Sequence, residues 1–189
     1  MKGVHLFLAQ GFEDMEALGT RDVLLRGGVP VVTVSITDDY TVESSHGLQV
    51  LADVNWRALE VMIPGTDASD VMIFPGGMPG SRNLANHDEL MDILREHWAD
   101  GGLVAAICAA PGLVVSQLDG LQGRRFTCFE GFQEPLIGKG AVYTPDPVVR
   151  DGNLITGRGA GLAVPFGLAI LEALKGPEEA ARVRSGLML

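Results

Sequence analysis

Short runs of apolar residues alternate with amphipathic stretches over the first 107 residues of the chain. Nearly every position in these runs is apolar and many are β-branched, which is typical of parallel strands buried on both faces of a sheet. The runs predict strands at 4–9, 29–36, 70–74 and 103–107. Between them, apolar residues return at helical spacing over residues 15–26 and 86–98. Each of these stretches ends near a glycine pair, which predicts two helices.

The remaining segments continue the alternation. A polar, alternating stretch at 40–51, with a turn around His46, predicts a small antiparallel hairpin. Further along we expect a loop at 63–67, a helix after Cys108 that ends at Leu118, a strand at 124–129, a loop at 130–140, a hairpin at 148–156, a helix at 162–174 and a last helix from Pro177. This order predicts an α/β fold: a flavodoxin-like, doubly wound, mostly parallel sheet with helices on both faces and a small antiparallel excursion.

Length and charge narrow the class of protein. The chain has 189 residues, 47% hydrophobic and 20% charged, which suits one α/β domain spanning 1–189. Its apolar runs are broken well before the roughly 18 residues that a membrane span needs, and no cleavage site follows the first residues, so we expect a cytoplasmic protein. A formal net charge of −10 argues against nucleic acid and anionic membranes as partners, which leaves a small molecule or a protein.

Cysteine and glycine spacing indicate neither a metal nor a cofactor. The chain has two cysteines, Cys108 and Cys128, without a CxxC motif or a Cys/His spacing typical of zinc sites. We therefore expect no disulfide framework and no bound metal. The glycine-rich segments 75–80 and 157–161 match neither a phosphate-binding loop nor a dinucleotide fingerprint, so no cofactor is expected.

Cys108 follows the strand 103–107 directly and precedes an expected helix. A nucleophile at such a strand-to-helix turn is lifted clear of the sheet edge, and the free N–H groups of the helix start favour a thiolate. Small neighbours, Ala106, Ala109 and Ala110, leave room for the sharp backbone turn. The alternative is an inert, buried cysteine that packs as a small hydrophobe.

Two other expected strands end in segments that carry chemistry. The first strand runs into a helix start with three acidic residues, and the third runs into Pro-Gly-Gly-Met-Pro-Gly at 75–80. The acidic residues are Glu13, Asp14 and Glu16. Because the carboxyl ends of parallel strands share one edge of a sheet, we expect both segments to meet Cys108 there.

The base that a catalytic cysteine usually pairs with is missing. All four histidines precede Cys108, which excludes the glutaminase arrangement, and Ala109 stands where a protease of this type carries a histidine. Glu16 is the candidate partner. An ionised Glu16 would raise the thiol pKa, so the pair works only if Glu16 is protonated and donates to sulfur. The helix start supplies roughly 1.5 pKa units and the donated hydrogen bond the rest. The alternative is that Glu13, Asp14 and Glu16 only form the solvated start of a helix.

Four motifs in this order resemble one family over nearly the whole chain. They are Gly-Phe-Glu-Asp-Met-Glu at 11–16, Phe-Pro-Gly-Gly at 74–77, Ala-Ala-Ile-Cys-Ala-Ala-Pro at 105–111 and Thr-Gly-Arg-Gly-Ala-Gly at 156–161. The chain is similar to the ThiJ/PfpI superfamily, close to the branch of the human parkinsonism-associated deglycase. The resemblance implies a flavodoxin-like homodimer with Cys108 as nucleophile and Glu16 as its protonated partner. It also implies an oxyanion pocket made by the backbone N–H groups of Gly76, Gly77 and Ala109.

The chain also departs from the family pattern at two positions, His46 and Cys128. Arg26 matches an arginine that lines an anion site at the dimer interface, and a second such arginine falls at His46 here. Cys128 stands where the human branch carries a histidine beside the nucleophile. Two cysteines near one turn could act as attacking and resolving thiols, or Cys128 could be a passive replacement.

These residues favour an enzyme for small 2-oxoaldehydes such as methylglyoxal, of the glyoxalase or deglycase type. The Cys108 thiolate would add to the aldehyde, and Glu16 would move a proton between carbons. A second hypothesis is a redox-responsive sensor or chaperone in which Cys108 oxidises without turnover. A third is a small-molecule hydrolase, or an enzyme related to thiamine, that uses the same turn.

Overall fold

The computed structural model describes residues 3–62 and 67–189, and its centre is a six-stranded sheet. The strands are β1 (Val4–Leu8), β2 (Val31–Ser35), β5 (Val71–Phe74), β6 (Leu103–Ile107), β9 (Val148–Asp151) and β10 (Leu154–Gly157). Their order in the sheet is β2-β1-β5-β6-β10-β9, and every neighbouring pair is parallel except β10 with β9. This confirms the predicted mostly parallel, doubly wound α/β sheet.

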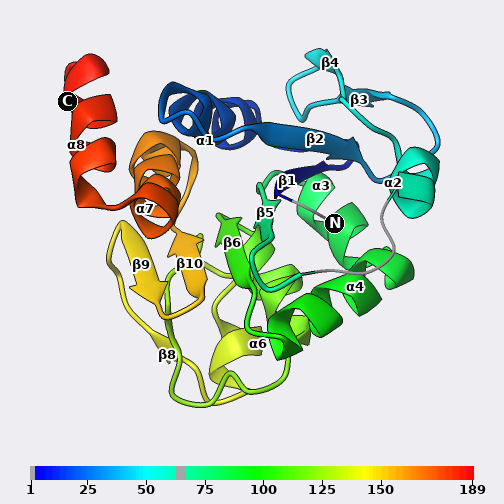
Figure 1. The fold of residues 1–189 in the computed structure, drawn as a ribbon. Coiled ribbons are helices and arrows are strands. Elements are labelled where there is room, and N and C mark those ends of the chain that lie inside the picture. The colour runs from blue at the N-terminus through cyan, green and yellow to red at the C-terminus, as the bar shows by residue number, and fades with distance from the viewer. Residues whose placement is uncertain (1–2, 63–66) are drawn as a thin grey trace.

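Helices cover both faces of the sheet because its strands are apolar on both sides (Figure 1). On β1, Leu6 and Leu8 pack into one buried cluster, whereas Phe7 between them packs into the other. One face carries α1 (Asp14–Arg26), α7 (Ala163–Lys175) and α8 (Pro177–Gly186). The other carries α2 (Trp56–Met62), α3 (Gly80–Ala85), α4 (Asp88–Ala99), α5 (Ala110–Leu113) and α6 (Glu134–Ile137). No helix of the described residues is long and apolar enough to cross a membrane.

Both predicted antiparallel hairpins are present. β3 (Thr41–Glu43) pairs with β4 (Gln49–Leu51) outside the main sheet, as the alternating polar pattern indicated. β9 and β10 form the second hairpin at the sheet edge. Its turn places Gly152 at φ +60°, a conformation that glycine adopts without strain, which explains the Asp-Gly-Asn sequence there.

Three of the predicted segments are wrong, and one strand was not predicted. The helix after Cys108 stops at Leu113 and continues as a 3-10 turn at Val115–Gln117, rather than reaching Leu118 as one α-helix. The expected loop at 130–140 contains the one-turn helix α6. The expected strand at 124–129 is reduced to β7 (Arg125–Phe126), which pairs in parallel with the unpredicted β8 (Val142–Tyr143).

Two helices also lie where none was predicted. α3 begins inside the Pro-Gly-rich loop, and α2 follows the first hairpin. Each spans two turns or less, which is too short for an apolar period of 3.6 to stand out from the sequence. The expected loop at 63–67 lies, apart from Asp67, outside the described residues.

Candidate active site

Cys108 sits in a strained backbone turn between β6 and α5. Its φ is +65°, a left-handed conformation that a residue with a side chain adopts at a cost of about 1–3 kcal/mol. Two backbone hydrogen bonds hold it there: its N–H donates to the carbonyl of Gly157 at 2.9 Å, and its carbonyl accepts from Phe129 N–H at 2.8 Å. The predicted strand-to-helix elbow is therefore present, with a half-buried thiol at its tip.

Glu16 lies in the first turn of α1 and is only 1% exposed. Glu13 caps this helix, because its carboxylate accepts a hydrogen bond from Glu16 N–H at 2.7 Å. The Glu16 carboxyl accepts from Gly76 N–H at 2.7 Å through Oε2. Its other oxygen, Oε1, is buried without a hydrogen-bond partner. A buried carboxyl with one oxygen unengaged is costly for stability and is typical of a functional group.

Gly76 and Gly77 bring the end of β5 against both neighbours. A Cβ on Gly76 would lie 2.5 Å from the Cβ of Cys108 and 3.1 Å from its Sγ, so only glycine allows this approach. Gly77 has φ +91°, and a Cβ there would lie 2.5 Å from Glu13 N. The Gly76 carbonyl accepts from Glu13 N–H at 3.0 Å. The loop is thus clamped between the elbow and the start of α1.

The Gly76→Ala variant is therefore expected to disturb the site specifically. The added methyl group overlaps Cys108 and must push the loop away, breaking the Gly76–Glu16 hydrogen bond. We expect the free energy of unfolding to fall by about 1–3 kcal/mol and the alkylation of Cys108 by iodoacetamide to slow at least tenfold. Denaturant unfolding and the alkylation rate measure the two effects.

The matched control is Gly186→Ala at the end of α8, where a Cβ meets nothing within 4 Å. It should leave alkylation unchanged and raise stability slightly, by at most about 1 kcal/mol, because alanine is the better helix former. A Gly76→Ala chain as stable and as reactive as the wild type would contradict the packing described here.

Burial governs the electrostatics of the pair. It raises the pKa of Glu16 to about 7; the Cys108 thiol and Gly76 N–H oppose the shift, and the charge of Glu13 adds to it. Burial also raises the pKa of Cys108 to about 12, and the charge of Glu16 adds to this, whereas the N–H groups of Gly77 and Ala109 oppose it. Two buried acids in contact do not both ionise near neutrality, so the pair loses one proton near pH 7 and retains the other.

The structure brings together five of the predicted site residues and alters the role of one. Glu16, Gly76, Gly77, Cys108 and Ala109 form one cluster from the ends of three adjacent strands. The N–H of Gly76, however, donates to Glu16 and not toward the thiol. The N–H groups that act on sulfur are those of Gly77 and Ala109, so the predicted oxyanion role falls to these two.

The helix dipole is a smaller contribution than the sequence suggested. α5 has a single α-helical turn, so the aligned peptide dipoles behind Cys108 are few. The expected gain of about 1.5 pKa units from a long helix therefore does not apply. The groups that favour a thiolate at Cys108 are the N–H groups of Gly77 and Ala109, and a proton donated by Glu16 stays a prediction.

Cys128 is placed differently from Cys108. It is 0% exposed and packs into the apolar cluster on the face of α2 to α6, whereas Cys108 packs against the cluster beneath α1 and α7. Burial raises the pKa of Cys128 to about 11, against the opposing charge of Arg158. These surroundings are those of a packing residue, and its role as a resolving thiol stays a prediction.

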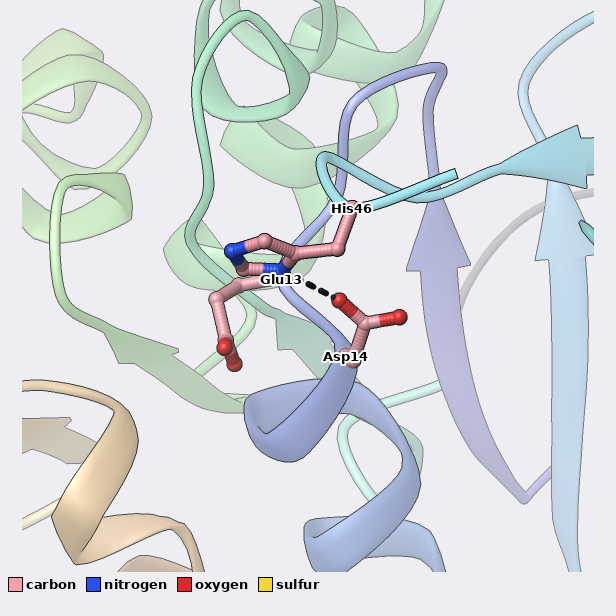
Figure 2. A group of neighbouring side chains, drawn as sticks. All are labelled: Glu13, Asp14 and His46. Carbon is pink, nitrogen blue, oxygen red and sulfur yellow. Dashed lines mark hydrogen bonds and ion pairs between the residues drawn. The ribbon is translucent and has the colours of Figure 1, made fainter. Parts of the chain in front are cut away.

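Arg26 and His46 lie at opposite ends of α1. Arg26 ends the helix and pairs with Asp22 at 2.6 Å, whereas His46 meets Asp14 at the helix start (Figure 2). Twelve residues of helix separate the two ends by about 18 Å. Within one chain they cannot line a common anion site, so this prediction depends on a second copy of the chain.

Three residues contribute to the site in ways that the sequence did not predict. Gly157 and Phe129 hold the elbow through their backbones, which leaves no signal in the side chains. Glu13 was expected only as a helix-start acid, and its capping bond orients Glu16.

A cavity of about 360 Å³ opens beside the elbow, lined by Phe129, Glu130, Arg158, Gly159, Ala160, Gly161 and Leu162.

Comparison with known proteins agrees with this fold. Residues 2–173 match the model of the DJ-1/PfpI family. The protein dj-1beta of Drosophila melanogaster is 35% identical over 188 residues, covering 100% of this chain and 97% of that protein. The oxidised DJ-1 of Toxoplasma gondii superposes with a TM-score of 0.87 at 30% identity, over 98% of this chain and 97% of that one.

A further relative carries an activity in its name. The glutathione-independent glyoxalase DJR-1.2 of Caenorhabditis elegans is 32% identical over 167 residues, covering 88% of this chain and 85% of that protein. The fold and the site define the class of protein: an α/β sheet with a cysteine elbow that contacts a buried glutamate. The chain belongs to the DJ-1/PfpI family.

Proposed function

We propose that this chain converts small 2-oxoaldehydes, such as methylglyoxal, to 2-hydroxy acids without glutathione. The observation that carries the proposal is the contact between a strained, half-exposed Cys108 and the buried carboxyl of Glu16, whose pKa burial raises to about 7. The glyoxalase name of the C. elegans relative supports the same reaction type.

The first step uses Cys108 as nucleophile. With the shared proton on Glu16, the thiolate attacks the aldehyde carbon and a carbon–sulfur bond forms. The electron pair of the carbonyl moves to oxygen, where the N–H groups of Gly77 and Ala109 stabilise the charge. Glu16 then donates its proton to that oxygen. The product is a hemithioacetal, and Glu16 is left as a carboxylate.

The second step uses Glu16 as base. Its carboxylate removes the hydrogen of the former aldehyde carbon as a proton and delivers it to the neighbouring carbonyl oxygen, which gives an enediol. The carboxylate then takes the proton of the hydroxyl group on the former aldehyde carbon and passes it to the neighbouring carbon. The former aldehyde carbon becomes the carbonyl of a thioester. Water cleaves the thioester, releases the hydroxy acid and restores the thiol. Methylglyoxal plus water thus gives lactate, with no external oxidant or reductant.

The unengaged oxygen of Glu16 suits this role. Oε2 is held by Gly76, which fixes the direction of the carboxyl, while Oε1 has no hydrogen-bond partner and can exchange a proton with sulfur or substrate. Burial places the pKa of Glu16 at about 7, close to the pH at which an acid and base must alternate. An exposed glutamate, with a pKa near 4.3, would hold its proton too rarely.

The test is turnover by the unmodified chain. Purified protein is incubated with methylglyoxal in the absence of thiols, and the formation of lactate is followed against buffer. We expect many lactate molecules per protein. A stoichiometric loss of methylglyoxal without lactate would overturn the proposal, because it would show adduct formation alone. Selective peroxide oxidation of Cys108 in such an inactive chain would instead favour the redox sensor.

A further inference from the structure

Beside the Cys108 site, three side chains from two separate segments form a cluster (Figure 2). Glu13 and Asp14 stand at the start of α1, and His46 comes from the turn between β3 and β4. Nδ1 of His46 lies 2.7 Å from Oδ2 of Asp14. One ligand atom from each of the three side chains lies within 4.8 Å of the other two.

Backbone hydrogen bonds hold the two segments in register. Ser45 N–H donates to the carbonyl of Phe12 at 2.8 Å, and Gly11 N–H donates to the carbonyl of Glu43 at 2.8 Å. The three side chains therefore project from a scaffold that is tied on both sides of the cluster. Coordination would need side-chain rotation only, without movement of the chain.

Charge and exposure suit a cation. The cluster holds two carboxylates, and among residues 3–62 and 67–189 no lysine or arginine forms an ion pair with either of them. His46 has a side chain that is 71% exposed, which leaves its imidazole open to solvent ligands. Its one ion-pair partner is Asp14, and that contact is the one a metal ion would replace or share.

We propose that Glu13, Asp14 and His46 form a binding site for a divalent cation of the zinc class. Two carboxylate oxygens and one imidazole nitrogen are a mixed donor set that Zn²⁺, Co²⁺ and Mn²⁺ accept, whereas Ca²⁺ and Mg²⁺ favour oxygen alone. Ligand distances of about 2.0–2.2 Å place three such donors on one side of the ion, with water completing the shell. The site shares Glu13 with the helix start that orients Glu16, but its test measures cation binding and does not depend on the chemistry proposed for Cys108.

The imidazole distinguishes this cluster from an ordinary acidic helix start. Asp14 and Glu13 alone would be explained by the helix dipole, which favours acidic residues in the first turn. His46 belongs to a segment 32 residues away in sequence and adds the nitrogen ligand that first-row metals prefer.

Calorimetric titration of the full chain with Zn²⁺ tests the site. We expect one binding event that weakens at least tenfold in His46→Ala and persists in Cys108→Ala, which separates it from any zinc held by the thiol. The matched control is Asp146→Asn, which removes an exposed carboxylate elsewhere and should bind as the wild type does. Zinc affinity in His46→Ala within twofold of the wild type would overturn the proposal.

A second measurement needs no substitution. Among the four histidines, His5 and His97 are buried and His87 is half-buried, so His46 is the exposed one. In a nitrogen-edited NMR spectrum, substoichiometric Zn²⁺ should shift the ring signals of His46 and leave those of His5 and His97 in place. Unchanged His46 signals at saturating Zn²⁺ would refute the site even if the alanine variant failed to fold.

Discussion

The Cys108→Ala variant is expected to lose methylglyoxal turnover down to the rate of buffer, a fall of at least about 10³-fold. Without sulfur, no hemithioacetal forms, and Glu16 has no bound carbon to deprotonate. The fold should survive, because alanine keeps the Cβ at the strained φ of +65° and leaves the backbone hydrogen bonds to Gly157 and Phe129 in place. Lactate formation measures the loss, and circular dichroism verifies the fold.

Cys128→Ala is the matched control for this experiment. It removes the only other thiol, from a position that is fully buried on the opposite face of the sheet. We expect a modest loss of stability, about 1 kcal/mol, from the small cavity, and turnover within a fewfold of the wild type. Equal losses in both variants would contradict the assignment of Cys108 as sole nucleophile and would support a role for Cys128 as a second thiol.

The Glu16→Gln variant is expected to lower turnover by about 10²–10⁴-fold, because glutamine can neither give nor take the proton that moves between substrate atoms. The side chain keeps its size, and its amide oxygen can still accept from Gly76 N–H. Lactate formation under the same conditions measures this effect. Wild-type turnover in Glu16→Gln would refute the proton-transfer role.

The pH dependence of Cys108 alkylation shows where the shared proton resides. Burial raises the pKa of both Glu16, to about 7, and Cys108, to about 12, so the pair loses its first proton near pH 7. If that charge resides on sulfur, wild-type alkylation rises with a midpoint near pH 7. Removing Glu16 then moves the midpoint upward, above the ordinary thiol value of about 8.5, since burial opposes the thiolate and no proton is donated to it.

The Glu16→Gln variant would shift the alkylation midpoint in the opposite direction if Glu16 held the charge. Wild-type Cys108 would then stay a thiol until far above pH 9, and Glu16→Gln would remove a repelling carboxylate and lower the thiol pKa. The proposed mechanism requires the first outcome, because its attacking group is a thiolate; the N–H groups of Gly77 and Ala109 favour that charge, whereas burial and the charge of Glu16 oppose it. Faster alkylation of Glu16→Gln than of the wild type at pH 7.4 would contradict it.

The convergence of the site could be predicted from the order of elements alone. Glu16, Gly76 and Cys108 follow β1, β5 and β6, which are neighbours in the sheet, and the carboxyl ends of parallel strands lie at one edge. The direction of individual groups could not be predicted this way. The N–H of Gly76 donates to Glu16 and not to an oxyanion, and this depends on a loop held between two other segments.

Short helices could not be predicted from the sequence either. Each of α5 and α6 is a single turn that includes a proline, so no apolar period marks it. Their positions are set by packing: a Cβ on Gly112 in α5 would lie 2.8 Å from the Cβ of Phe132, just before α6. Contacts of this kind join residues about 20 apart and leave no local pattern.

The sequence by itself determined the α/β class, both hairpins, the elbow and the glutamate that meets it, because hydrophobic period and turn residues act locally and parallel strands impose a common edge. Only the tertiary structure decided the rest. It set the φ of Cys108, the burial that moves both pKa values, the packing of Cys128 and Cys108 against different core clusters, and the meeting of His46 with Glu13 and Asp14. These features depend on which distant segments pack together and how much water they exclude. Local patterns along the sequence do not specify either of these.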